Sequence, residues 1–199
     1  MLERRFTRRS WCTGTMMGLA LVGTFCMDSP SATAAGLSQG DPLGAFYVTK
    51  IGGGHEDGVE VGEDLCYRCR YGSRPMAIAF VRSVDGKVPE LAKSLAAMTE
   101  TFEGENFRAL VTVLDADGEQ AKAMAEKLSD TFAESVVPIT VAKDHATGPL
   151  NYRIDADAEV TVVIASDSQV SAVQTGTAKD LDLAQVRKSV EAMLEAAAL

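Results

Sequence analysis

The order of apolar strands and amphipathic helices most constrains the fold of this 199-residue chain. Short apolar runs, which are typical of buried strands, alternate with segments whose apolar residues recur every three or four positions, the spacing of one helix face. Because consecutive parallel strands need a crossover connection, this alternation predicts a parallel sheet covered by helices.

The ends of the expected elements can be placed from turn and capping residues. Ser166-Asp167-Ser168 separates two late strands and predicts a β-hairpin, and Asp182 can cap a last helix. The expected strands are 46–51, 76–81, 109–114, 138–142, 159–165 and 169–173, and the expected helices are 89–102, 124–132 and 182–197. The order predicts one α/β domain over residues 46–199, with a central mixed sheet, flanking helices, and a C-terminal hairpin plus helix.

The first 34 residues have the layout of a secretory signal peptide. Four arginines precede an uncharged stretch from Trp11 to Met27, and Ala32-Thr33-Ala34 supplies a cleavage site of the A-x-A type. Thr7-Arg8-Arg9-Ser10-Trp11 also resembles a twin-arginine signal. The alternative is a retained N-terminal anchor, but the apolar span is short for a bilayer. We expect an exported, periplasmic or extracytoplasmic protein that leaves the membrane after cleavage, with a flexible lead-in over residues 35–45.

The charge of the chain excludes one class of partner. It holds 19 basic and 28 acidic residues, a net charge of −9. Removing the four arginines and two acids of the leader brings the net charge to −11. So acidic a surface repels phosphate backbones, and we expect no nucleic-acid partner. The sequence specifies no oligomeric state.

Two cysteines form the strongest chemical motif. Cys12 and Cys26 lie in the leader, so Cys66 and Cys69 are the pair that remains after cleavage. Three arginines surround this pair: Arg68, Arg70 and Arg74. Nearby cations lower the pKa of a thiol. After one sulfur of such a pair has formed a mixed disulfide with a partner, the other sulfur can resolve it. The pattern predicts catalytic cysteines with thiolate-supporting arginines, and a protein thiol or disulfide as the partner.

Two other interpretations of the pair stay open. A structural disulfide would pin the loop 52–75 to the sheet, as is common in exported proteins. A metal half-site would need two further ligands, which could come from a nearby group of residues: His55, Glu56, Asp57, Glu63 and Asp64. Arg70 excludes a c-type haem site, which needs histidine at that position. We expect no metal and no cofactor. We also expect no helix after the pair, because Pro75 and an extended strand follow.

The order of elements resembles the thioredoxin-like fold superfamily, and its redoxin/peroxiredoxin-like branch in particular. The similarity extends over residues 43–199 and includes Tyr152-Arg153-Ile154, which lies where these proteins place a segment before their penultimate strand. It implies a thioredoxin-like fold and, for function, thiol–disulfide chemistry.

Two features of that family are missing here. Its C-x-x-C follows the central strand, where this chain has Arg82-Ser83-Val84-Asp85-Gly86, and its cis-proline would fall near Val160, where there is no proline. The resemblance therefore implies one of two functions. The first is a thiol–disulfide oxidoreductase that uses the displaced Cys66/Cys69 pair. The second is a non-enzymatic binding or scaffold domain in which this pair is a structural disulfide.

Overall fold

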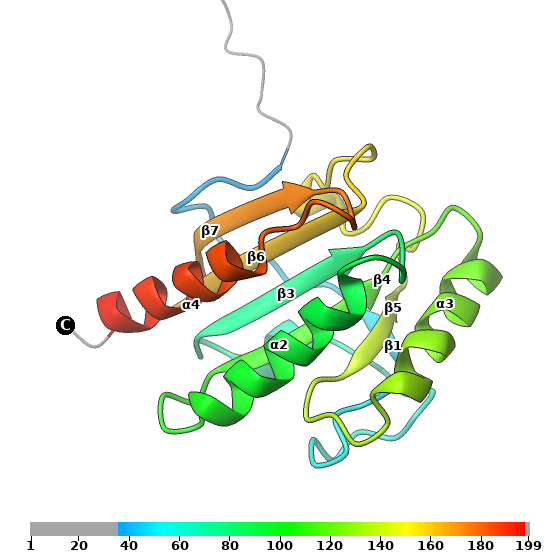
Figure 1. The fold of residues 1–199 in the computed structure, drawn as a ribbon, viewed down its shortest axis with the longest axis horizontal. Coiled ribbons are helices and arrows are strands. Elements are labelled where there is room, and N and C mark those ends of the chain that lie inside the picture. Colours follow the sequence, from blue (N-terminus) through cyan, green and yellow to red (C-terminus); the bar gives the residue numbers. More distant parts are fainter. Residues whose placement is uncertain (1–35, 198–199) are drawn as a thin grey trace, which may run out of the picture. The chain divides into compact units, whose positions relative to one another are not determined.

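A computed structural model describes residues 36–197, so the signal peptide predicted over residues 1–34 lies outside the described part. The described residues form a seven-stranded sheet in the order β2-β1-β5-β4-β3-β6-β7 (Figure 1). The elements are β1 (Val48–Gly52), β2 (Asp64–Leu65), α1 (Tyr67–Tyr71), β3 (Met76–Val81), α2 (Val88–Thr101), β4 (Arg108–Val113), α3 (Gly118–Thr131), β5 (Ile139–Ala142), the 3-10 helix η1 (Leu150–Tyr152), β6 (Val160–Ser166), β7 (Gln169–Gly176) and α4 (Leu183–Ala197).

The strand directions confirm the predicted mixed sheet. Strands β3, β4 and β5 are parallel neighbours, and α2 and α3 provide the crossovers between them. Strand β6 runs antiparallel to β3, and β7 returns antiparallel to β6, which is the expected hairpin. At the other side β1 is antiparallel to both β5 and β2.

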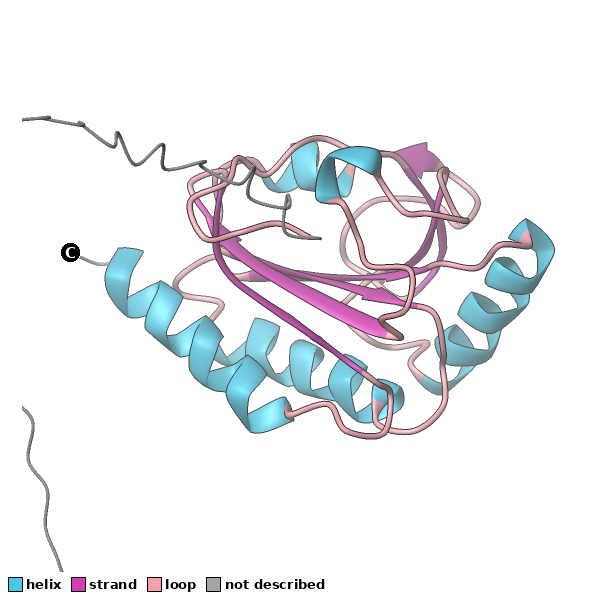
Figure 2. Ribbon diagram, turned by 90° about the horizontal axis from the view of Figure 1, so that it is seen from above, coloured by secondary structure: helices cyan, strands magenta, loops and turns pink. Residues whose placement is uncertain are grey.

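Each face of the sheet buries its own apolar cluster. In β3 the alternate residues Ala77, Ala79 and Val81 belong to a core shared with α2, α3 and α4, whereas Ile78 and Phe80 belong to a second core on the opposite face. The long helices α2, α3 and α4 lie on one side of the sheet and the short helices α1 and η1 on the other, as Figure 2 shows. The second face is therefore covered mainly by α1, η1 and loops.

The expectation that no helix follows the cysteine pair is wrong. Five residues form α1, and Gly72 ends it with a φ of 66°, a backbone conformation that glycine adopts readily. The turn at Gly72 leaves room for the chain to become extended before Pro75. The helix begins between the two cysteines, contains Cys69 and ends before Pro75, so the proline does not prevent it.

The segment before β1 lies beside β7. The backbone N–H of Gly40 donates to the Val170 carbonyl, and the N–H of Leu43 donates to the Ser168 carbonyl, each at 2.8 Å. The side chain of Leu43 is buried in the second core. Residues 40–43, part of the expected flexible lead-in, are thus held against the sheet edge. Within residues 36–197 no helix is long and apolar enough to cross a bilayer.

Candidate functional site

The cysteine pair lies at the start of α1, on the face of the sheet opposite the long helices. Cys66 and Cys69 form a disulfide with their Cα atoms 5.2 Å apart. Cys66 is the N-cap residue, and its Sγ accepts a hydrogen bond from the backbone N–H of Cys69 at 3.1 Å. Cys66 is only 8% exposed, whereas Cys69 is exposed to solvent. The two sulfurs therefore belong to residues of very different accessibility.

Two buried tyrosines hold α1 against the sheet. The Tyr67 hydroxyl donates to Oδ2 of Asp57, and the Tyr71 hydroxyl donates to the Ala109 carbonyl at 3.1 Å. Burial raises the pKa of both phenols well above the ordinary value, and the hydrogen bond to Asp57 raises that of Tyr67 further. Both hydroxyls therefore stay protonated and act as donors.

A buried lysine organises the loop beneath this helix. Lys50 is only 3% exposed, and its Nζ donates to the carbonyls of Gly54 and Val59 and to Oδ1 of Asp57, all within 2.9 Å. The same Oδ1 accepts the N–H of Val59 at 2.8 Å. The other carboxylate oxygen of Asp57 accepts the Tyr67 hydroxyl. Asp57 therefore links β1, the loop that follows it and α1 in one hydrogen-bond network.

The three predicted arginines lie on α1 or just after it. Arg68 donates through Nε to the Leu43 carbonyl at 2.8 Å, and Arg70 donates to the Asp57 carbonyl at 2.5 Å. These two bonds tie α1 to segments 25 and 13 residues earlier in the chain. Support of a thiolate by these arginines stays a prediction.

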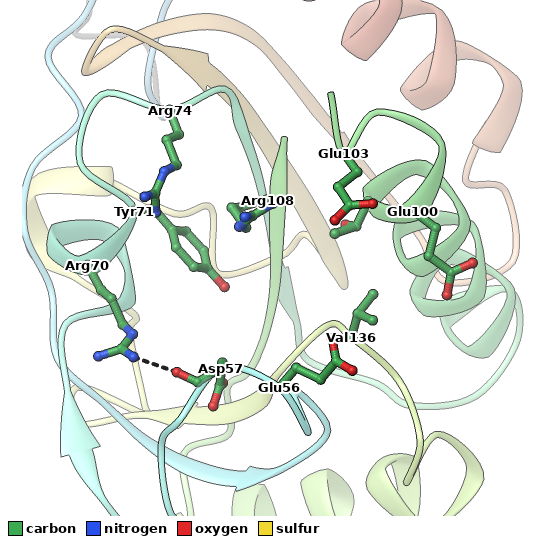
Figure 3. A pocket seen from close by; sticks show the side chains of 10 residues that line it. Glu56, Asp57, Arg70, Tyr71, Arg74, Glu100, Glu103, Arg108 and Val136 are labelled. Carbon is green, nitrogen blue, oxygen red and sulfur yellow. Dashed lines mark hydrogen bonds between the residues drawn. The ribbon is translucent and has the colours of Figure 1, made fainter. Parts of the chain in front are cut away.

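A pocket of about 450 Å³ opens beside α1. Arg70, Tyr71 and Arg74 form one side together with Arg108 at the start of β4 (Figure 3). Glu100 near the end of α2 and Glu103 just after this helix lie across from them, and Glu56 and Asp57 also line the pocket. This pocket could not be predicted from the sequence, because its residues come from segments far apart in the chain.

Nothing in the described part of the chain supports the metal interpretation. Both cysteines are in the disulfide, and residues 36–197 contain no group of three His, Cys, Asp or Glu side chains that could hold a metal. Asp64, one of the proposed ligands, accepts hydrogen bonds from Lys143 and Thr49, which lower its pKa from the ordinary value of an aspartate. His55 lies 3.3 Å from the Ser135 carbonyl through Nδ1.

The residues after β3, where the thioredoxin-like family carries its C-x-x-C, contain no cysteine in this chain. After β3, the Arg82 guanidinium donates to the carbonyls of Ala146 and Thr147, at 2.9 and 3.4 Å. Residues 36–197 also contain no cis peptide bond, in agreement with the missing proline near Val160. The cysteine pair before β3 is thus the part of the described chain that could perform thiol chemistry.

Solved structures similar to this chain share its fold. A candidate thiol:disulfide interchange protein DsbE from Chlorobium tepidum has a TM-score of 0.57 at 16% identity, over 79% of this chain and 99% of that one. A reduced 2-Cys peroxiredoxin from Plasmodium vivax has a TM-score of 0.58 at 12% identity, over 82% and 100%. AhpC from Mycobacterium tuberculosis has a TM-score of 0.53 at 15% identity, over 79% and 98%.

These likenesses show the fold alone, since the identities are low. No family model matches the sequence, and no curated protein matches it either. The fold class is nevertheless clear, and the chain has the thioredoxin-like fold that its sequence predicted. The structural neighbours include both peroxiredoxins and a DsbE-type protein.

Sequence reasoning missed Lys50 and considered Asp57 only as a possible metal ligand. Lys50 and Asp57 lie on either side of a glycine run and match no motif. One signal was nevertheless present: Phe46, Val48 and Lys50 alternate along the chain, which places a lysine on the apolar face of the first strand. A lysine at such a position needs an acidic partner, and Asp57 is that partner.

Proposed function

We propose that this protein is an exported thiol–disulfide oxidoreductase that exchanges electrons with protein thiols through Cys66 and Cys69. The observation that carries the proposal is the unequal pair, in which the disulfide joins an exposed residue, Cys69, to a buried residue at a helix N-cap, Cys66. The thioredoxin-like fold supports it, and the N-terminal layout supports export.

The geometry favours Cys69 as the sulfur that meets the partner. In the oxidised protein, a partner thiolate attacks Cys69 Sγ, the bond to Cys66 breaks, and its electron pair stays on Cys66 as a thiolate. A second thiolate of the partner then attacks the partner sulfur of this mixed disulfide. The partner leaves with a new disulfide, and both cysteines are left reduced. The N–H of Cys69, 3.1 Å from Cys66 Sγ, stabilises the thiolate that leaves in the first step.

The experiment that tests this proposal combines the reduction potential of the pair with a rate assay. We expect a potential above about −300 mV, in the range of exchangeable disulfides, and catalysis of insulin reduction or of dithiol oxidation. The Cys66→Ser/Cys69→Ser variant should lose this turnover. A potential well below that value together with no turnover would reject the proposal.

A non-enzymatic scaffold function is the second candidate. Its supporting observation is that both Tyr67 and Arg70 bind α1 to the Asp57 loop by hydrogen bonds. Such a rigid unit is where a structural disulfide is expected.

Export is tested separately, by fractionation of the producing cells and N-terminal sequencing of the recovered protein. Cleavage after Ala34 is expected, and an intact leader in the membrane fraction would indicate the anchor.

A further inference from the structure

The pocket beside α1 carries opposite charges on opposite sides. Two further acids line the pocket, but Asp57 is paired with Lys50 and Glu56 lies 3.6 Å from Nε2 of His55. Of the other charged side chains, Arg70, Arg74 and Arg108 line one side, and Glu100 and Glu103 line the other (Figure 3). None of these five side chains takes part in an ion pair with another residue of the described part of the chain. The two sets of charges therefore face a common space without neutralising each other.

Most N–H donors of these arginines have no hydrogen-bond partner within residues 36–197. A guanidinium has five N–H donors. Arg70 uses one nitrogen on the Asp57 carbonyl, and Arg108 uses one on the Phe107 carbonyl at 2.8 Å. The side chain of Arg74 makes no hydrogen bond within residues 36–197. Free donors in such number suit a carboxylate, which a guanidinium can bind with two parallel hydrogen bonds.

The two sides together select the chemistry of the ligand. A simple anion would be attracted by the arginines and repelled by Glu100 and Glu103. A simple cation would be attracted by the two glutamates and repelled by the arginines. A molecule with a carboxylate at one end and an ammonium at the other satisfies both sides. The volume of about 450 Å³ lies in the range of small-molecule sites.

We propose that this pocket binds a zwitterion, a free amino acid or a short peptide with both ends free. The carboxylate lies against Arg74 and Arg108, and the ammonium lies against Glu100 and Glu103. This binding does not depend on the redox chemistry of the cysteine pair, although Arg70, the residue after Cys69, lines the same pocket.

Calorimetric titration of the full chain with glycine, diglycine, triglycine and tetraglycine tests the proposal and finds the preferred length. We expect the best peptide to lose about tenfold or more in affinity when either end is blocked, by N-acetylation or by amidation, because each block removes one charged hydrogen-bonding group. Arg74→Gln and Glu103→Gln should weaken binding of the free peptide to a similar extent.

The blocked peptides and matched variants assign each end to its side of the pocket. Glu103→Gln should leave the affinity for the acetylated peptide unchanged, and Arg74→Gln should leave that for the amidated peptide unchanged. Glu105→Gln and Arg187→Gln, which alter charges outside the pocket, should have no effect. The Cys66→Ser/Cys69→Ser variant should bind as the parent does, so a failure of the redox proposal would not obscure the result. Equal affinity for free and blocked peptides, or no binding at all, would overturn the proposal.

Discussion

At the scale of single residues, accessibility and thiolate stabilisation favour different cysteines. Cys69 is exposed, whereas Cys66 is buried and accepts the N–H of Cys69 on its sulfur. A buried sulfur is poorly reached by reagents, but an N–H donor favours its ionised form. This division fits a pair in which one sulfur meets the partner and the other becomes the leaving thiolate.

Alkylation of the single variants tests the difference in accessibility between the two sulfurs. At about pH 10, where an ordinary thiol is largely ionised, Cys66→Ser, which retains Cys69, should react with iodoacetamide about tenfold faster than Cys69→Ser. Equal rates at high pH would contradict the assignment of Cys69 as the accessible sulfur.

The ion pair between Lys50 and Asp57 gives a second residue-scale prediction. Lys50→Met leaves Asp57, which is 14% exposed, without its cationic partner, and removing one member of a buried pair costs about 3–5 kcal/mol. We expect a loss of about 3 kcal/mol in the free energy of unfolding, measured with urea. Lys122→Met is the matched control, because it breaks an exposed pair with Glu126 and should change stability by less than about 1 kcal/mol. A loss as small as that of the control would show that water stabilises Asp57 instead.

At the scale of elements, the long strands and helices could be predicted because their apolar residues repeat with a clear period. The strand expected at 76–81 is β3 (Met76–Val81), and the helix expected at 89–102 is α2 (Val88–Thr101). The shorter α1 and β2 have too few residues for a repeat of apolar positions to be seen. Strand β2 forms through pairing with β1, where Leu65 lies opposite Val48. The cysteine pair was visible in the sequence, but the pocket and the network beneath α1 depend on residues that only the tertiary fold brings together.

The glycine run after β1 is an element-scale feature that can be tested. Gly53 has a φ of +61°, and a Cβ there would lie 2.3 Å from the Val137 carbonyl oxygen. Gly53→Ala should therefore lower the free energy of unfolding by about 1–3 kcal/mol in urea denaturation. Gly104→Ala, where a Cβ meets nothing within 4 Å, should stay within about 0.5 kcal/mol of the parent. Equal stability of the two variants would mean that the loop 53–58 adjusts freely.

At the scale of the whole molecule, we expect the two cores to stabilise the fold more than the disulfide does. The sheet buries one cluster against α2, α3 and α4 and another against α1, η1 and the lead-in segment. The disulfide joins residues only three positions apart, and closing so short a loop removes little entropy from the unfolded chain. We therefore expect that the disulfide can be broken and remade while the rest of the molecule stays folded.

The cysteine-free chain tests this separation directly. For a loop of this length the chain-entropy relation gives about 2 kcal/mol, so Cys66→Ser/Cys69→Ser should remain folded with a loss no larger than that. The measurement is urea denaturation followed by circular dichroism, and the parent chain treated with a reductant serves as the control, since it should lose the same amount. Unfolding of both would identify the disulfide as a structural requirement and favour the scaffold function. A folded, cysteine-free chain that has lost only its thiol exchange would separate the chemistry of α1 from the stability of the fold, as a redox function requires.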